Sequence, residues 1–401
     1  MIKGFNIKTI DDVSIKDKRV LVRVDYNVSF TKQHKVADDL RIRQSLPTLR
    51  YLLKGNNKII LMAHLGQPKH VDNHYSLEPL VKNIKELLPG VPVSFLDNFD
   101  SENGQKYLAS QKPGEIILLE NLRFHPEEKE NNEAFAKKLS HLADIYVNDA
   151  FGVSHREDAS VVSISKFIPS YAGLLLKREV EAIGHFFTHP KKPVVAIIGG
   201  AKISTKLHFL HSLIDKIDVL LLGGGLANTF LLARGIHAGR SLVEEHEVGR
   251  AKDVIHYAKK RGVKVILPED AVVVRVEEEQ IVEERVCRVE DIKGHESIFD
   301  IGPETQAEFG AEIASAHTLL WNGPVGFVEN PRFARGTDFL FYAIAQNENA
   351  YSLVGGGDTI AAISKKEYID KITWVSTGGG AMIEFIEKGT LPGLEALTER
   401  A

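Results

Sequence analysis

Short apolar runs that alternate with longer segments of helical spacing constrain the fold of this chain more than any other feature. The runs are rich in Val, Ile and Leu, which is typical of strands buried on both faces of a parallel sheet. They lie at residues 19–25, 58–63, 115–120, 145–148, 194–198, 219–222, 264–267, 318–321, 352–354 and 372–375. Intervening segments such as 132–142 and 254–261 are long enough to form crossover helices. The pattern predicts an α/β fold with mostly parallel sheets.

The chain has 401 residues, more than a single hydrophobic core usually accommodates. A domain boundary is expected near residues 175–193, where the helical spacing of Lys177–Phe187 is followed by the breaker-rich stretch His189–Pro193. We therefore predict two Rossmann-like lobes, each with a mostly parallel sheet flanked by helices, joined by a hinge helix. The acidic stretch Glu277–Asp291 is expected to form a solvated hairpin.

Composition excludes several classes of function. The formal net charge is −4, from 50 Lys and Arg against 54 Asp and Glu, so a nucleic-acid partner is not expected. The single cysteine, Cys287, can form no internal disulfide. No apolar run approaches the roughly 20 residues that a bilayer requires, and no secretory signal is visible. The sequence predicts a soluble, cytoplasmic protein with no membrane partner.

Glycines follow four of the predicted strands in the second half and precede helical segments. These turns lie at 199–200, 223–225, 355–357 and 378–380. Glycine is ordinary in tight βα turns, but four such turns at one sheet edge favour a ligand site, because helix N-termini offer free N–H groups to phosphate. None of the turns matches G-x-x-x-x-G-K-[ST] or the dinucleotide fingerprint G-x-G-x-x-G. The turns predict a nucleotide site that is neither a P-loop nor a dehydrogenase site.

Two charged groups accompany these turns. Lys202 and Lys206 are four residues apart, and we expect them on one face at the start of a helix, directed toward the glycines and suited to phosphate. Asp358 and Thr359 are expected to open another helix beside Gly355–Gly357. A carboxylate there would either hold Mg²⁺ on nucleotide phosphates or cap the helix.

The first-half strands end in polar residues rather than glycines. Cations, with Asp and Asn among them, follow these strands or lie in nearby loops, and the set includes Asp25, Asn27, Arg41, His64, Asn121, Arg123, Asn148, Asp149 and Arg156. Guanidinium groups match phosphate and carboxylate geometry, so the set predicts a site for a small anion that carries both groups. A merely solvated loop face is the alternative. If both sites exist, lobe closure near residues 175–193 would exclude water during transfer.

Eleven motifs, in one order along the whole chain, resemble those of the phosphoglycerate kinase family. They are VLVRVDYNV at 20–28, RIRQSLPTL at 41–49, LMAHLGQP at 61–68, ENLRFHP at 120–126, NDAFGVSHREDAS at 148–160, IGGAKISTK at 198–206, GGGLANTF at 223–230, DIGPE at 300–304, WNGPVGFVE at 321–329, VGGGDT at 354–359 and VSTGGGA at 375–381.

The resemblance implies reversible phosphoryl transfer between 1,3-bisphosphoglycerate and Mg-ADP, giving 3-phosphoglycerate and Mg-ATP in glycolysis and gluconeogenesis, with hinge closure of the lobes. It also implies a phosphoglycerate-binding domain at 1–180, to which a segment of about 385–401 returns, a nucleotide-binding domain at 181–384, and a monomer. Implied catalytic residues are Arg41, Lys206, Gly379 and Gly380. Implied substrate ligands are Asp25, Asn27, Arg41, His64, Gln67, Arg123 and Arg156. Implied nucleotide ligands are Lys202, Lys206, Ile298, Glu329, Gly356, Gly357, Asp358 and Thr359, with Asp358 on Mg²⁺ and Glu329 on the ribose.

Three positions depart from the family pattern. Gln67 stands where the family usually has Arg, so one expected cation for the substrate phosphate is missing. Ile298 replaces a common Gly, and Phe327 replaces a smaller apolar residue, at the adenine pocket. Two other hypotheses remain at this point: an inactive metabolite-binding protein, and an oxidoreductase on a Rossmann lobe.

Overall fold

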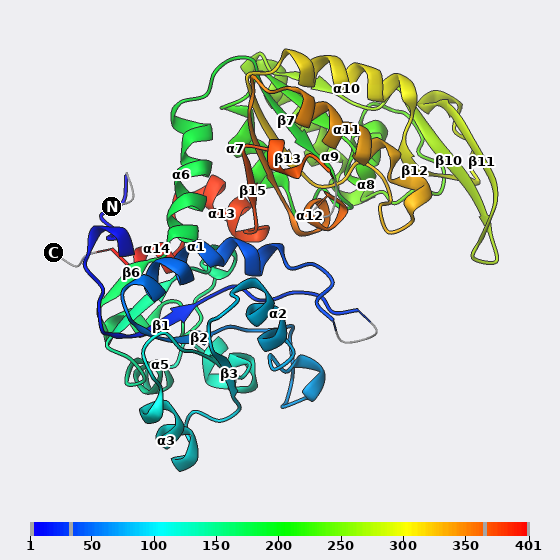
Figure 1. Cartoon of the computed structure of the whole chain (residues 1–401). Helices are drawn as coiled ribbons and strands as arrows, with labels where there is room; N and C mark the ends of the chain where they lie inside the picture. Colours follow the sequence, from blue (N-terminus) through cyan, green and yellow to red (C-terminus); the bar gives the residue numbers. More distant parts are fainter. Residues whose placement is uncertain (1–3, 32–34, 364–366, 399–401) are drawn as a thin grey trace. The chain divides into compact units, whose positions relative to one another are not determined.

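The computed structural model describes residues 4–31, 35–363 and 367–398. The chain forms two compact units, one of Met1–Glu181 with Lys388–Ala401 and one of Ala182–Glu387. Each unit contains a six-stranded sheet whose strands are all parallel, with helices packed around it (Figure 1). The predicted fold class, two parallel-sheet α/β lobes, is confirmed.

The first unit has the strand order β3-β4-β2-β1-β5-β6. Its strands are β1 (Arg19–Arg23), β2 (Lys58–Met62), β3 (Val93–Leu96), β4 (Ile116–Leu119), β5 (Ile145–Asn148) and β6 (Ser170–Ala172). Its helices are α1 (Leu40–Lys54), α2 (Leu80–Leu87), α3 (Glu102–Ser110), α4 (Pro126–Lys129) and α5 (Glu133–Ser140). The central strands were predicted, whereas β3 and β6, which lie at the two edges, were not.

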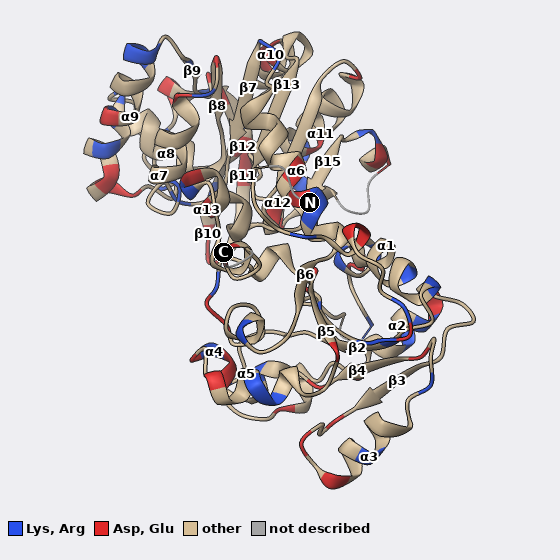
Figure 2. Cartoon of the chain, turned by 90° about the vertical axis from the view of Figure 1, so that its left-hand side faces the viewer, with Lys and Arg blue, Asp and Glu red and all other residues tan. Residues whose placement is uncertain are grey.

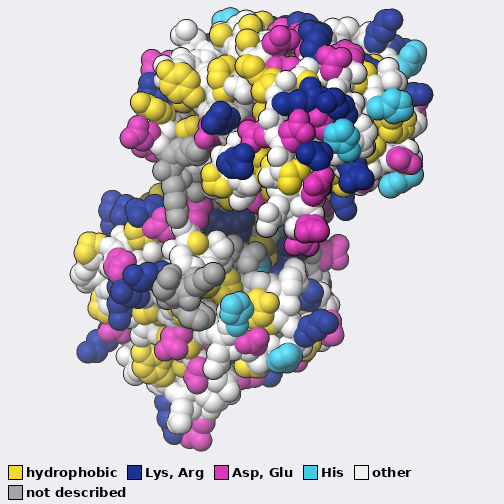
Figure 3. All heavy atoms as spheres, turned by 90° about the vertical axis from the view of Figure 1, so that its right-hand side faces the viewer, with side chains coloured by type: hydrophobic (Ala, Val, Ile, Leu, Met, Phe, Trp, Pro, Cys, Tyr) yellow, Lys and Arg dark blue, Asp and Glu magenta, His cyan; other side chains and the backbone are white. Residues whose placement is uncertain are grey.

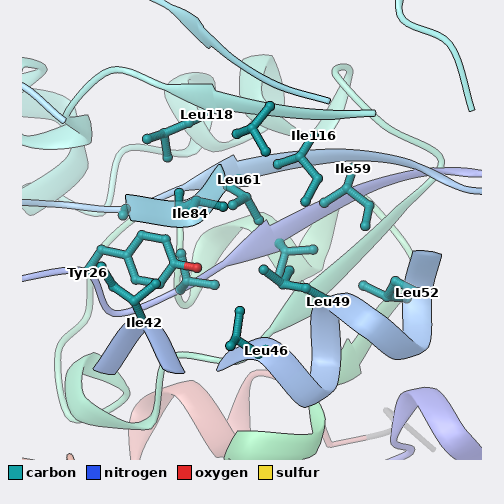
Figure 4. Packing of buried hydrophobic residues seen from close by; sticks show 14 of the residues in the cluster. Tyr26, Ile42, Leu46, Leu49, Leu52, Ile59, Leu61, Ile84, Ile116 and Leu118 are labelled. Atoms are coloured by element: carbon teal, nitrogen blue, oxygen red, sulfur yellow. The ribbon is translucent and has the colours of Figure 1, made fainter. Parts of the chain in front are cut away.

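The packing of α1 against the sheet shows how the pattern of apolar residues determines which face of a helix is buried in the first unit. Ile42, Leu46, Leu49 and Leu52 recur every three or four residues, which places them on one helix face. Figure 4 shows this face packed against side chains from the central strands, with the buried Tyr26 beside Ile42. Burial of each such leucine contributes about 1.5–3 kcal/mol. This packing fixes the backbone from which the site residues of α1 extend.

The second unit has the strand order β15-β14-β13-β7-β8-β9. Its parallel strands are β7 (Val194–Ile198), β8 (Val219–Leu222), β9 (Lys264–Ile266), β13 (Thr318–Asn322), β14 (Tyr351–Gly355) and β15 (Trp374–Ser376). Its helices are α7 (Leu207–Ile214), α8 (Gly224–Ala233), α9 (Val248–Arg261), α10 (Pro303–Ser315), α11 (Arg335–Gln346), α12 (Gly357–Ile363) and α13 (Gly380–Lys388). All six parallel strands of this unit were predicted, with small differences in their bounds.

A separate antiparallel sheet of order β11-β10-β12 belongs to the second unit. It consists of β10 (Asp270–Glu277), β11 (Gln280–Arg288) and β12 (Glu296–Ile301). The hairpin of β10 and β11 extends from this unit in Figure 1, and the side chains of β11 are largely exposed. The stretch Glu277–Asp291, predicted as a solvated hairpin, contains the turn and the second strand of this hairpin, whereas its first strand begins earlier, at Asp270. Cys287 lies on β11.

The helix α6 (Leu174–Thr188) contains the boundary between the two units. Its first turn is capped from within the first unit, since the Asp149 carboxylate accepts hydrogen bonds from the N–H groups of Leu175, at 2.9 Å, and Leu176, at 3.3 Å. Near the C-terminus, α14 (Pro392–Glu395) packs on the first unit, where the Gly393 N–H donates to the Ser154 carbonyl at 2.8 Å. Residues 399–401 of the predicted returning segment lie outside the described residues.

Charged side chains of both signs are interspersed on the surfaces of the units. Figure 2 shows acidic and basic residues together on helices such as α9, and Figure 3 shows the same mixture on another face. Within the part of the chain that the structure describes, no helix combines the length and apolarity that a membrane span requires.

Candidate functional site

The predicted anion-binding residues gather at the carboxyl edge of the first unit's sheet. Asp25 and Asn27 follow β1, and His64 follows β2. Arg123 lies in a short 3-10 helix after β4, Arg156 lies in the loop after β5, and Arg41 lies in the first turn of α1. Because carboxyl ends of parallel strands share one edge, the fold brings together residues that are far apart in the sequence.

The Arg41 guanidinium is held in place by the loop that follows β1. Its Nη1 donates to the Asp25 carboxylate at 2.8 Å and to the Asn27 carbonyl at 3.3 Å. Asp25 is 6% exposed and Arg41 is 28% exposed, so the pair is only partly shielded from solvent. The Asn27 side chain also accepts from the Gly66 N–H at 2.9 Å, which links the loops after β1 and β2.

His64 is buried and receives a hydrogen bond from Arg23 in β1. The Arg23 Nη2 lies 3.1 Å from His64 Nδ1. Since a guanidinium can only donate, Nδ1 must accept, and the ring proton resides on Nε2. Burial lowers the pKa of His64 well below its ordinary value, and the nearby charges of Arg23, Arg156, Arg41 and His155 lower it further. The neutral ring therefore presents an Nε2–H donor, which has no partner among the described residues.

Arg123 presents further donors at the same edge. Its Nη1 binds the Gly66 carbonyl, while its Nε and Nη2 are buried and have no hydrogen-bond partner within the described ranges. Unpaired buried donors are costly, at about 1–3 kcal/mol each, and such groups are expected at ligand sites. The Asn121 side chain fixes this loop by bonding to Leu65 and to the Arg123 N–H.

Two of the predicted polar residues at this edge serve the fold instead. Asp149 caps α6, and burial raises its pKa to about 7. The Asn148 side chain accepts from the Ala150 N–H at 3.0 Å.

Gln67 is exposed, and its side-chain oxygen accepts a hydrogen bond from Lys129 Nζ at 3.2 Å.

In the second unit, a cleft of about 380 Å³ opens beside the glycine turns. Three predicted nucleotide ligands, Ile298, Glu329 and Asp358, line it. Its other lining residues are Gly200, Ala201, Gly224, Gly225, Asn228, Arg240, Ser241, Leu242, Ser297, Phe299, Pro324, Val325, Gly326 and Phe327. The cleft joins an apolar part to backbone and polar groups, as small-molecule sites usually do.

Two aromatic rings form one wall of this cleft. Phe327 is 46% exposed, and its ring meets that of Phe299 edge to face at a centroid distance of 5.3 Å. Ile298 lies on β12, where its N–H donates to the Ser241 hydroxyl at 2.8 Å. Two of the three positions that depart from the family pattern, Ile298 and Phe327, therefore lie at the apolar part of the cleft.

The glycine turns after β14 and β15 adjoin each other. Gly356 has a φ of +111° and Gly379 has a φ of +42°, conformations that favour glycine. A Cβ on Gly379 would lie 3.8 Å from the Gly357 backbone nitrogen. Since Gly357 begins α12 and Gly380 begins α13, two helix N-termini meet at this point. Their free N–H groups and positive dipole ends suit phosphate oxygens.

Asp358 and Thr359 both lie in the first turn of α12, as predicted, but differ in burial. Asp358 is exposed and lines the cleft. Thr359 is fully buried, and its hydroxyl accepts from the Gly323 N–H at 2.7 Å. The Thr359 side chain thus ties two βα turns together.

The expected placement of Lys202 and Lys206 on one helical face is wrong. Helix α7 begins only at Leu207, because residues 201–206 form turns after Gly200. Lys202 is exposed, whereas the Lys206 ammonium donates to the Gly199 carbonyl at 2.7 Å and to the Asn322 side-chain oxygen at 2.7 Å. Burial lowers the pKa of Lys206 to about 8, against an opposing effect of the Asp358 carboxylate.

Sequence reasoning missed two residues that organise these sites. Arg23 is fully buried and donates to the Val24 carbonyl, the Ser160 hydroxyl and His64. An arginine inside an otherwise apolar strand was the available signal, since buried charges need partners. Asn322 ends β13, binds Lys206 and donates to the Gly355 carbonyl at 3.0 Å. It directly follows the strand predicted at 318–321, and no role was predicted for it.

Comparisons with known proteins agree on one family. A family model described as phosphoglycerate kinase matches residues 10–389. The phosphoglycerate kinase of Dictyoglomus turgidum is 45% identical over 397 residues, covering 98% of this chain and 99% of that protein. The corresponding enzyme of Moorella thermoacetica is 44% identical over 393 residues, covering 98% and 99%.

Solved structures give the same result. The phosphoglycerate kinase of Coxiella burnetii has a TM-score of 0.84 and 38% sequence identity, covering 98% of this chain and 100% of the other. That of Pyrococcus horikoshii has a TM-score of 0.83 and 31% identity, covering 98% of each chain. The chain belongs to the phosphoglycerate kinase family.

Proposed function

We propose that the first unit binds the phosphoglycerate and the second binds the nucleotide. The chain is a kinase that reversibly moves the acyl phosphate of 1,3-bisphosphoglycerate to ADP, giving 3-phosphoglycerate and ATP. The observation that carries the site assignment is the group of buried, unpartnered donors on His64 and Arg123 beside Arg41. Such donors suit a compact anion that carries phosphate and carboxylate groups.

In the first unit, Arg41, Arg123 and Arg156 would neutralise the substrate, and His64 would donate from Nε2. Asp25 and Asn27 hold Arg41 in place and would accept from the substrate hydroxyl. This division follows from the hydrogen-bonding capacity of each group, because His64 Nδ1 is already bound by Arg23 and only the carboxylate and amide oxygens could accept from a ligand.

In the second unit, Ile298 and Phe327 would enclose the base, and Glu329 would bind the ribose. Lys202, Lys206 and the turn Gly356–Gly357 would bind the phosphates, and Thr359 would hold that turn in place. The N–H groups of Gly379 and Gly380 would face the phosphoryl group that moves. The adjoining N-termini of α12 and α13 support this assignment.

The reaction requires positioning and charge neutralisation rather than a general base. When ATP is consumed, the nucleophile is a carboxylate, which is ionised at neutral pH because carboxyl pKa values lie at about 3–4. Arg41 and Lys206 would stabilise the charge on the moving phosphoryl group. Transfer also requires that the two ligands come within bonding distance, so we propose hinge closure with exclusion of water.

Magnesium fits the residues of the second unit in one way. The described residues contain no group of three or more His, Cys, Asp and Glu side chains able to hold a metal ion. Mg²⁺ in kinases is held by one or two carboxylates together with the nucleotide phosphates, and the exposed Asp358 at the start of α12 meets that requirement. Asp358 would hold the ion, which would neutralise phosphate charge.

We expect Asp358→Asn to raise KM for Mg-ATP at least about tenfold, because one charged metal ligand is lost. KM for 3-phosphoglycerate should stay within twofold. Calorimetric titration with ADP should show that Mg²⁺ strengthens binding to the parent protein but not to the variant. Equal enhancement by Mg²⁺ in both proteins would remove Asp358 from the metal site.

Nucleotide binding is expected to depend on pH through Lys206. In the protein without nucleotide, the Lys206 side chain is protonated below about pH 8. A bound phosphate would raise the pKa of Lys206 above this value. Binding above pH 8 must therefore take up a proton, so Kd for ADP should rise with pH, by up to tenfold per unit. Calorimetry at pH 8.5 in two buffers of different ionisation enthalpy should reveal the uptake, and Lys206→Met should abolish it. An uptake that persists in the variant contradicts the assignment.

A coupled assay with Mg-ATP and 3-phosphoglycerate tests the function as a whole. Turnover is expected, and its absence would favour an inactive metabolite-binding protein. GTP assayed in parallel tests whether Ile298 and Phe327 alter the choice of base. An NAD titration should show no binding, as expected if the chain is not an oxidoreductase.

We further propose a cytoplasmic monomer with small-molecule substrates and no nucleic-acid or membrane partner.

A further inference from the structure

Lys129 places a positive charge at the tip of the Gln67 side chain. Its Nζ donates to Gln67 Oε1 at 3.2 Å, although the two residues are 62 positions apart. Gln67 follows β2 in the same loop as His64, and Lys129 ends α4, directly after the segment that carries Arg123. The contact therefore joins two loops that already supply donors to the anion site.

The backbone of α4 is fixed close to Lys129. The preceding residue, Glu128, is fully buried, and its carboxylate accepts from the Ser160 N–H at 3.0 Å and from the Ser160 hydroxyl. Its carbonyl accepts from the Ala159 N–H at 2.8 Å. Lys129 thus extends from an anchored position, although its own side chain is exposed.

The charge of Lys129 acts on the same neighbourhood as the arginines of the site. The buried Asp158 carboxyl shows this effect: burial raises its pKa, whereas the charges of Arg23, Arg156, His155 and Lys129 lower it. Lys129 is therefore close enough to act on the same carboxyl as Arg156.

We propose that Lys129 supplies the positive charge for the substrate phosphate that Gln67 cannot provide. Its bond to Gln67 Oε1 leaves the Gln67 amide group free to donate, so the two side chains together offer one charge and several N–H donors. Lys129 is a specificity-determining residue of the first unit. This inference rests on the proposed binding of phosphoglycerate there.

The test is steady-state kinetics of Lys129→Ala. KM for 3-phosphoglycerate should rise about five- to tenfold, the scale of one charged contact to phosphate at an exposed position. The kcat and KM for Mg-ATP should stay within twofold, which also shows that the variant is folded. The matched control is Lys137→Ala, which removes an equal exposed charge from the neighbouring helix α5 and should leave every constant unchanged.

A second substitution separates a phosphate contact from a general loss of charge. Gln67→Arg in the Lys129→Ala background should restore KM for 3-phosphoglycerate to within twofold of the parent. In the parent background, Gln67→Arg should change this KM by a smaller factor than it does in the Lys129→Ala background. A KM in Lys129→Ala within twofold of the parent, or no rescue by arginine, overturns the inference. An inactive parent protein would instead refute the proposed function itself.

Discussion

Replacing Arg41 by alanine is expected to lower kcat at least about 10²-fold, the loss typical of one preorganised transition-state donor. The guanidinium is held by Asp25 and the Asn27 carbonyl beside the unpartnered donors of His64 and Arg123. Its remaining N–H groups can therefore meet charge that develops on the transferred phosphoryl group. Rapid-quench measurement of the chemical step, in addition to steady-state kcat, checks the expectation.

The control for this experiment lies on the same helix. Arg43 is also near the start of α1, but it is 58% exposed and pairs with Asp39 at 2.8 Å. Arg43→Ala should keep kcat within twofold. Arg41→Lys keeps the charge opposite the buried Asp25 and so separates catalysis from folding. It should retain the melting temperature of the parent and still lose most of the activity, because an ammonium cannot provide the planar fork. A kcat within threefold of the parent in Arg41→Ala contradicts the assigned role.

The sequence predicted the central strands because burial on both faces demands uninterrupted apolar runs. The runs at 145–148, 194–198 and 219–222 coincide with β5, β7 and β8. The edge strands β3 and β6 escaped prediction since they are short and partly exposed, so their sequences need not be apolar throughout. The hairpin was predicted, but its extension by β12 into a three-stranded sheet was not.

Side-chain roles were less predictable than strands. His64 and Arg123 were named as candidates, but their unsatisfied donors become evident only when the neighbours of each atom are known. Asp149 has the same position at a strand end as the site residues, yet it caps α6. The single-face argument for Lys202 and Lys206 failed because it assumed a helix at residues that form turns. In each case the deciding partner is distant in the sequence or a backbone group, which local pattern does not reveal.

Replacing Lys206 by methionine is the second large effect that we expect, again a loss of at least about 10²-fold in kcat. The ammonium is bound by the Gly199 carbonyl and the Asn322 side chain, in the turns that border the cleft of the second unit, where we propose that the nucleotide binds. Its charge is partly desolvated, since burial lowers its pKa to about 8. A charge in such a site interacts more strongly with a moving phosphoryl group than a solvated one does.

Methionine retains most of the side-chain volume, so packing should change little, and the melting temperature measures the remaining cost. Removing the ammonium also removes the free-energy cost of burying its charge. This gain offsets part of the stability lost with the hydrogen bonds to Gly199 and Asn322. Lys252→Ala, at an exposed position on α9, is the control and should leave kcat unchanged. If Lys206→Met raised KM for ATP while kcat stayed within threefold of the parent, Lys206 would bind the ground-state nucleotide and would not stabilise the transition state.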